Sequence, residues 1–495
     1  MIRIFQALIF IIVAGTMVTA QNVKDNLDSF FSILAKNHQF NGNALIAENG
    51  KVIYEQSFGY ADFSKGKLNR KESTFPIASI TKTFTATAIL QLCEQGKLNV
   101  NDPVIKYLRE FPYPTVTIRH LLSHTSGLQS YDNFFESLRT AHPDTVFTNK
   151  DILPRYAALK LPLFYQPGDD GNYDNVNFIF LALIVEKVSG MPFHDYIGKF
   201  ILQPAGMSHT FFPKVIFYHY TPEEKKNLSL TYWYPHLYSG NLEQTDTIQF
   251  VSKYWSTYNF EGFGEIISTT EDLLNYDQAL YNGKLLTDAT LKEAFTLVKL
   301  NNGKDNPVGN GLGWKIEKDS TLGKIVEHGG GMIGLRSSLF RNITKHQTII
   351  LIDNTQDETD GIARDVLKIL NGQTVKPYGK SIAREYGKEL VNNGIGAAET
   401  VLAKLEEDTV HCSLNENEFN SLGYDLMGNH KMKEALETFK INTQLFPDSW
   451  NVYDSYGEAL LKNGQKEEAI KMYRKSILIN ADNQNGKKVL EEILK

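Results

Sequence analysis

The sequence predicts an α+β fold: an antiparallel sheet flanked by helices plus an all-helical domain, followed by an α-helical tail. Three observations support this fold class. Apolar runs of strand length alternate with helical stretches from residue 22 to residue 372. Strand-like runs lie at both ends of that region, so the two ends should close one sheet against the helices between them. From residue 381 to the end the pattern is almost wholly helical. The 495 residues are too many for one ordinary domain.

The strands are predicted near the two ends of the first region. Ala44–Ala47 and Lys51–Tyr54 flank Asn49-Gly50, and an Asn-Gly pair between strands is a strong signal for a β-hairpin. Near the other end, Ser337–Phe340 and Thr348–Ile352 have the composition of two further strands.

The first 20 residues have the features of a signal peptide. A short positive region precedes an apolar run over residues 4–18, and small residues follow at the positions needed for cleavage before Gln21. An uncleaved membrane anchor is the alternative, but the run is short for a span of about 20 residues. We therefore expect an exported protein, periplasmic or secreted, with no stable membrane anchor.

Composition excludes several other classes. The net charge is −6 with no basic stretch, which argues against a nucleic-acid partner. The two cysteines, Cys93 and Cys412, lie far apart and lack metal-type spacing. A disulfide framework is therefore excluded and a structural zinc site is not indicated. We expect no metal and no organic cofactor.

The tail, residues 381–495, carries a repeat at an offset of 34 residues, after a linker at 373–380. The matched pairs are Gly423 with Gly457, Leu426 with Leu460, Asn429 with Asn463, Ala435 with Ala469 and Phe439 with Tyr473. This period resembles tetratricopeptide repeats, with units at 418–451 and 452–485 and a degenerate helix pair at 382–407. Stacked helix pairs need caps, so the tail should lean on the first domain or on a protein partner.

Ser79-Ile80-Thr81-Lys82 is the strongest candidate for chemistry. It opens an apolar, helix-periodic run that ends near Gly96. Residues three apart share a helix face, so the Lys82 amine can lie beside the Ser79 hydroxyl. A serine hydroxyl needs a neighbouring base to become a good nucleophile. The alternative is that Ser79 is an ordinary helix N-cap.

Three further motifs follow Ser79 and Lys82 along the chain. These are the stretch 118–128, which contains His120 and His124, then Tyr173-Asp174-Asn175 before an apolar helical run, and His328-Gly329-Gly330-Gly331 before the last strands. In this order they resemble the serine β-lactamase and penicillin-binding-protein superfamily, specifically its class C-like branch, which also contains esterases and D-amino-acid peptidases. The resemblance covers most of residues 22–372.

The resemblance implies a role for each catalytic candidate. Ser79 would attack a carbonyl and form an acyl-enzyme, and Lys82 would keep the hydroxyl proton mobile. Tyr173 would act as partner base and then as the acid that protonates the leaving group, which requires a depressed pKa near cationic Lys82.

The resemblance also implies the substrate-binding groups. Asn175 would hold Lys82 and the substrate amide, and the backbone N–H groups of Ser79 and Gly331 would bind the oxyanion. Glycines at 329–331, Gly330 among them, would let a strand edge come close to the substrate. Many relatives have lysine where this chain has His328, and histidine is mostly neutral at pH 7. This difference favours an esterase or peptidase over an efficient antibiotic hydrolase.

Other interpretations apply to single residues. Tyr173 could be a buried structural tyrosine. His120 and His124, four apart, could ligate a metal, but no Glu follows His120, and structural roles are favoured. Asp174 is an unusual charge in its motif, for which the sequence suggests only solvent exposure. Two aromatic clusters are equally consistent with a substrate pocket and with packing: Tyr232-Trp233-Tyr234 and Tyr254-Trp255.

The sequence therefore predicts an exported serine hydrolase that acts through a Ser79 acyl-enzyme on ester or amide bonds. Its small-molecule or peptide substrates would be short acyl esters, D-amino-acid peptides or β-lactams. The alternative is a non-catalytic peptidoglycan- or protein-binding scaffold that uses the repeat tail. No serine has glycine at both −2 and +2, which removes the nucleophile-elbow hydrolases.

Overall fold

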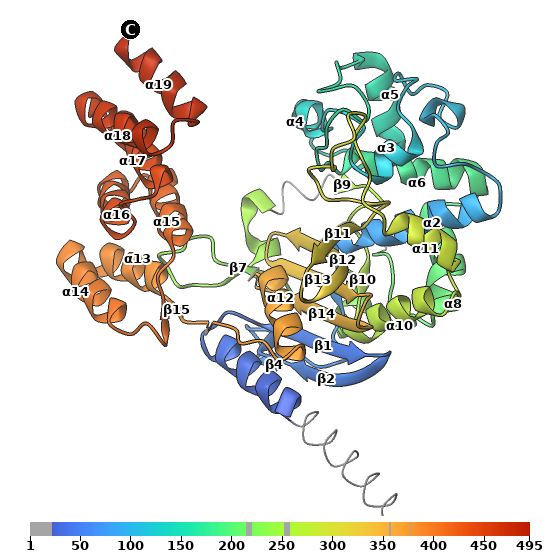
Figure 1. The fold of residues 1–495 in the computed structure, drawn as a ribbon, viewed down its shortest axis with the longest axis horizontal. Coiled ribbons are helices and arrows are strands. Elements are labelled where there is room, and N and C mark those ends of the chain that lie inside the picture. The colour runs from blue at the N-terminus through green and yellow to red at the C-terminus, as the bar shows by residue number, and fades with distance from the viewer. Residues whose placement is uncertain (1–21, 214–219, 252–257, 356–357, 377) are drawn as a thin grey trace, which may run out of the picture. The chain divides into compact units, whose positions relative to one another are not determined.

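A computed structural model describes residues 22–213, 220–251, 258–355, 358–376 and 378–495 (Figure 1). The predicted signal peptide and the Tyr254-Trp255 pair lie outside these residues. The chain forms two compact units. The first comprises the chain up to Trp233 together with Gln244–Val375, and the second comprises Tyr234–Glu243 together with Lys376–Lys495.

The first unit contains a six-stranded sheet in the order β11-β12-β13-β14-β1-β2, antiparallel throughout. Its strands are β1 (Gly42–Glu48), β2 (Lys51–Ser57), β11 (Lys315–Asp319), β12 (Gly323–Met332), β13 (Leu335–Asn342) and β14 (Gln347–Asp353). Strand β1 pairs with β14, so the two ends of the region meet in the middle of the sheet, which confirms the predicted α+β class. The predicted hairpin is also confirmed: Asn49 and Gly50 connect β1 and β2 with φ of 50° and 73°, as a tight two-residue turn requires.

Alternate residues of β13 show which helices cover each face of the sheet. Ser337 donates a hydrogen bond to the carbonyl of Ile77, and Arg341 forms a buried ion pair with Asp277 of α10 (Thr270–Tyr281). Ser338, on the opposite face, donates to Asp360 of α12 (Thr359–Leu370). The sheet therefore lies between α12 on one face and, on the other, α10 and the turn that follows Ile77 (Figure 1).

Two helices that pack against each other, α2 (Thr81–Glu94) and α6 (Val176–Ser189), are buried over most of their surface. Helix α2 ends close to the predicted position. Gly96, with φ of 67°, follows its last turn and donates to the Cys93 carbonyl at 2.9 Å. Within the described ranges no single helix is long and apolar enough to cross a membrane; one pair, α6 with Phe193–Ala205, passes that test by length and composition but is bent by 74°.

The second unit is built from consecutive helices that pack in pairs. They are α13 (Ile382–Asn393), α14 (Ile395–Glu406), α15 (Glu416–Gly428), α16 (Met432–Leu445), α17 (Trp450–Lys462), α18 (Lys466–Ile479) and α19 (Gln484–Leu494). A side chain at Gly423 would meet the Phe439 ring at 2.6 Å, and one at Gly457 would meet the Tyr473 ring at 3.2 Å. These contacts explain the small and large residues at the 34-residue offset. The tetratricopeptide class of the helices stays a prediction.

Candidate active site

Ser79 lies in a short turn, η1 (Ala78–Ile80), directly before α2. Ala78 has φ of 45°, an uncommon conformation for a residue other than glycine, which marks a constrained turn. The N-cap residues of η1 and α2 are Ile77 and Ile80, so the interpretation of Ser79 as a helix N-cap is wrong. Ser79 is half-buried and lines a cleft.

Lys82 is completely buried beneath Ser79. Its ammonium donates to three acceptors: Ser79 Oγ at 3.0 Å, Asn175 Oδ1 at 2.8 Å and the Phe263 carbonyl at 3.0 Å. Three donors and three acceptors account for every N–H of the group. Burial lowers the pKa of Lys82 to about 7, although the charges of Glu265 and Asp174 act in the opposite direction. At neutral pH a part of the Lys82 population is therefore an unprotonated amine beside the hydroxyl.

Glu265, which the sequence analysis missed, holds the turn that supplies the third acceptor. Its carboxylate accepts the N–H groups of Gly262 at 2.7 Å, Phe263 at 3.2 Å and Gly264 at 2.9 Å. Burial raises the pKa of Glu265 to about 7, and the charge of Glu261 adds to this effect. The sequence did contain a signal for Glu265: it follows a glycine and precedes two isoleucines. A charged residue in such an apolar surrounding rarely lacks a partner.

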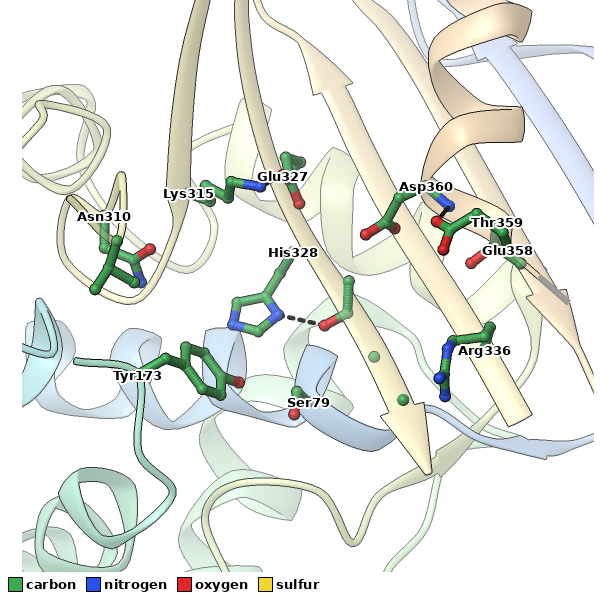
Figure 2. Close-up of a pocket in the computed structure, with 14 residues that line it drawn as sticks. Ser79, Tyr173, Asn310, Lys315, Glu327, His328, Arg336, Glu358, Thr359 and Asp360 are labelled. Atoms are coloured by element: carbon green, nitrogen blue, oxygen red, sulfur yellow. Dashed lines mark hydrogen bonds and ion pairs between the residues drawn. The ribbon is translucent and has the colours of Figure 1, made fainter. Parts of the chain in front are cut away.

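Tyr173 and Ser79 point toward each other beneath His328 (Figure 2), and the Ser79 hydroxyl is close enough to influence the pKa of Tyr173. Tyr173 is 42% exposed as a whole residue, whereas its hydroxyl group is buried. Burial raises the pKa of Tyr173, and the nearby Ser79 hydroxyl only partly offsets this. The expected depressed pKa is therefore wrong: desolvation of the phenolate is the largest effect, and the charges of Asp174 and Glu327 add to it.

His124 supports Tyr173 from behind. Its buried ring packs 4.3 Å from the Tyr173 ring, between centroids, and its Nδ1 accepts the Asp174 N–H at 3.2 Å. His120 instead caps the short helix α3 (Ile118–Leu122), where its Nδ1 accepts the Thr117 N–H at 3.2 Å. Both histidines therefore have structural roles, and the described residues contain no group of three metal-ligating side chains.

Asp174 fixes the start of α6. Its Oδ1 accepts the Val176 N–H at 2.8 Å, and it is only partly exposed. Burial raises the pKa of Asp174, so the expected solvent exposure is wrong. The next residue, Asn175, holds Lys82 as the sequence analysis predicted. The stretch 173–175 thus combines the start of α6 with two side chains, those of Tyr173 and Asn175, that face the Lys82 amine.

Strand β12 brings the glycine motif against the nucleophile turn. A side chain at Gly330 would overlap both the Ile77 carbonyl oxygen and Ser337 Oγ, so only glycine permits this approach. Gly331 pairs with Arg336 of β13. His328 is buried, and its Nδ1–H donates to the Gly329 carbonyl at 2.7 Å. Burial and the charge of Lys82 lower the pKa of His328 to about 3, which confirms that it is neutral.

The cleft in front of these groups has a volume of about 470 Å³. Ser79, Tyr173 and residues 328–331 line it (Figure 2). Two cations that were not predicted from the sequence also line it. Lys315 is paired with the buried Glu327 at 3.0 Å, and Arg336 donates to the Leu335 carbonyl at 3.1 Å.

The predicted aromatic lining is not part of the cleft as far as the described residues go. Tyr232 is buried, and its hydroxyl accepts the Phe63 N–H at 3.0 Å. Trp233 packs its ring edge-on against Phe250. Both residues are therefore packing residues of β7 (Tyr232–Trp233).

Comparisons with known proteins agree with this geometry. Residues 27–371 match the Beta-lactamase family. Penicillin-binding protein 4* of Bacillus subtilis (strain 168) is 35% identical over 366 residues, which cover 72% of this chain and 78% of that protein. The crystal structure of a penicillin-binding protein from Bacillus halodurans aligns with a TM-score of 0.56 and 26% identity, over 69% of this chain and 98% of that one. A D-stereospecific amidohydrolase from Streptomyces sp. aligns with a TM-score of 0.51 and 25% identity, over 67% and 97% of the two chains.

Proposed function

This chain belongs to the Beta-lactamase family, and from that premise we propose that it is a serine hydrolase that cleaves ester or amide bonds through an acyl-enzyme on Ser79. The observation that carries the proposal is the contact between Lys82 Nζ and Ser79 Oγ at 3.0 Å, with the Tyr173 hydroxyl pointing toward the same oxygen (Figure 2). Lys82 and Tyr173 thus converge on the Ser79 hydroxyl at the edge of an open cleft.

Acylation begins when the unprotonated Lys82 amine takes the Ser79 proton. Ser79 Oγ then forms a bond to the substrate carbonyl carbon, and the carbonyl oxygen becomes an oxyanion. We assign its stabilisation to the backbone N–H groups of Ser79 and Gly331, which the close approach of Gly330 to Ile77 brings together. Such a donor pair stabilises the developing charge because it is fixed before reaction.

Collapse of the intermediate breaks the bond to the leaving group. The neutral Tyr173 hydroxyl gives its proton to the departing oxygen or nitrogen. The Lys82 ammonium then gives the proton that it took from Ser79 to the Tyr173 oxygen, so that both side chains return to their starting state. Water then attacks the acyl-enzyme by the same steps in reverse and releases the acid. The raised pKa of Tyr173 favours this acid role over the role of first base.

The substrate class follows from the charge at position 328. A neutral His328 offers no fixed cation for a substrate carboxylate, so we favour short acyl esters and D-amino-acid peptides over β-lactams. The similarity to a D-stereospecific amidohydrolase supports the peptide option. The signal-peptide features of residues 1–20 support the proposal that these substrates are met outside the cytoplasm.

Covalent labelling distinguishes the hydrolase from the non-catalytic scaffold. A fluorophosphonate or penicillin probe should label the wild-type protein and leave Ser79→Ala unlabelled. Thr83→Ser is a suitable matched variant, because it alters a hydroxyl on the same helix that donates only to the Ile80 carbonyl. If no probe of either class labels the folded protein, the result supports the non-catalytic scaffold that uses the repeat tail.

The pH dependence of acylation should follow Lys82. Below about pH 7 the amine is protonated and cannot take the serine proton, so kcat/KM should fall as the pH decreases through about 7. The pKa of His328, lowered to about 3, places its titration well outside this limb. Initial rates with a p-nitrophenyl ester between pH 5 and 9, corrected for spontaneous hydrolysis, measure the profile. A flat profile over this range would contradict the assignment of Lys82 as base.

Glu265→Gln should both slow the reaction and shift the acidic limb of the pH profile of kcat/KM. A glutamine has one acceptor oxygen where the carboxylate has two, so the turn at 262–264 loses part of its support and Lys82 is less well placed. We expect kcat/KM to fall by about ten- to a hundredfold. Loss of the negative charge also lowers the pKa of Lys82, so the limb moves to lower pH. Glu293→Gln, which removes a carboxylate paired with Arg119, is the control, and equal profiles for the two variants would exclude a specific role for Glu265.

A further inference from the structure

The second unit holds a segment that belongs, by sequence, to the middle of the first domain. This docking segment, Tyr234–Glu243, was predicted to be part of the domain at 22–372, but it packs with the tail helices. Tyr238 is buried in the same apolar cluster as Tyr386 and Phe419. The Arg384 guanidinium lies 4.9 Å from the centroid of the Tyr234 ring.

One tail residue makes polar contacts with the backbone and a side chain of the docking segment. Asp425 of α15, whose side chain is 15% exposed, accepts the Leu237 N–H at 2.7 Å and lies 3.3 Å from His236 Nδ1. The 34-residue repeat aligns Asp425 with Ala459, a fully buried residue of α17. The repeat pattern is therefore broken by a carboxylate at the position that binds the segment.

The residues that flank the docking segment pack on the wall of the cleft. The chain leaves the first unit after Trp233 and returns at Gln244. Within the first unit, Gly334 is so close to Tyr232 and Thr245 that a side chain there would meet the Tyr232 carbonyl at 2.9 Å. Gly334 lies in the turn that connects β12 with β13.

This turn places two groups of the cleft. Gly331 precedes it on β12, and Arg336 follows it on β13. Met332 and Ile333 of the same stretch pack against Ile248 and Val251, which follow the returning chain. A displacement of the docking segment would therefore move, through the covalent chain, the flanking residues that support the cleft wall.

We propose that Asp425 is a positioning residue: by anchoring the docking segment on the helical tail, it fixes the β12–β13 turn and so the cleft wall at Gly331 and Arg336. The tail then acts as an intramolecular receptor for its own chain. The kinetic part of this proposal rests on the proposed hydrolase function, whereas the anchoring itself does not.

Hydrogen exchange and kinetics of the full-length protein test the two parts separately. In Asp425→Ala, the amide of Leu237 loses a charged acceptor, so its exchange should accelerate by about ten- to a hundredfold. With a p-nitrophenyl ester, kcat/KM should fall by about three- to tenfold, because Gly331 and Arg336 are less well placed while Ser79 and Lys82 are untouched. Asp425→Asn keeps an acceptor oxygen and should recover most of both losses.

Asp454→Ala is the matched control, because Asp454 accepts a hydrogen bond from Asn483 within the tail and does not contact the docking segment. It should leave the exchange of residues 235–240 and kcat/KM as in the wild type. His236→Ala, on the segment side, provides a second test if Asp425→Ala folds poorly. Unchanged exchange in Asp425→Ala would overturn the anchoring, and faster exchange with unchanged kcat/KM would overturn the effect on the cleft. Failure of the wild type to hydrolyse any ester or amide would overturn the proposed function, and the exchange result would still test the anchoring.

Discussion

Lys82→Met is expected to lower kcat/KM by about 10³- to 10⁴-fold, because it removes the only base that contacts the Ser79 hydroxyl among the described side chains. Methionine has a similar length and occupies the same buried space. The change removes a buried charge but leaves the acceptors of Asn175 and Phe263 unsatisfied. These effects oppose each other, so the free energy of unfolding should change by no more than about 2 kcal/mol.

Lys82→Arg separates a base from a fixed positive charge. Arginine stays protonated at every pH of the assay and cannot accept the serine proton. The variant should therefore be almost as slow as Lys82→Met. If it keeps most of the wild-type kcat/KM, Lys82 acts through its charge alone. Urea denaturation of both variants provides the folding control.

Gly330→Ala is expected to lower kcat by about 10²- to 10³-fold, the loss typical of a misplaced oxyanion donor. The added methyl group would overlap the Ile77 carbonyl oxygen and Ser337 Oγ. Strand β12 must then move away from the nucleophile turn, and the Ser337–Ile77 hydrogen bond, 2.8 Å long, is lost. We also expect a loss of stability of about 1–3 kcal/mol from the overlap.

Gly331→Ala serves as the comparison, because it adds the same methyl group one residue further along β12. There the methyl group would meet Arg336 Nη1 at 2.9 Å, the far end of a flexible side chain. The arginine can move, so the loss of kcat should be clearly smaller than in Gly330→Ala. Steady-state kinetics of the two variants on one ester give the ratio. Equal losses would show that the close approach at Gly330 has no special role.

The sheet was predictable because its signals are local. The Asn49-Gly50 turn fixes the β1–β2 hairpin, and the apolar runs at 337–340 and 348–352 form β13 and β14. That β1 lies beside β14 follows from the need to pair both ends of the region. The helical nature of the tail was predictable in the same way, from its repeat.

Parts of the site depend on three-dimensional contacts that no local pattern contains. The sequence analysis predicted that Lys82 lies beside Ser79 and Asn175, and the structure brings these groups together. It did not predict the raised pKa of Tyr173, because burial of a single hydroxyl is not visible in a motif. Glu265 was missed because it acts through the backbone of its neighbours rather than through a recognisable motif.

The docking segment was missed for a related reason. Residues 234–243 have no repeat or charge pattern that relates them to the tail, and Asp425 lies 188 residues further along the chain than Leu237. The connection is visible only in three-dimensional contacts such as the pairing of the Leu237 N–H with Asp425. Departures from a repeat, such as Asp425 opposite Ala459, are therefore worth inspection in tails of this kind.

The most direct measurement is the intact mass of the protein after rapid mixing with a slowly hydrolysed acyl ester and acid quench. The proposed function predicts a mass increase equal to one acyl group, located by peptide mapping on Ser79 and absent in Ser79→Ala. An acyl adduct on any other residue, or product formation by Ser79→Ala at the wild-type rate, would contradict it.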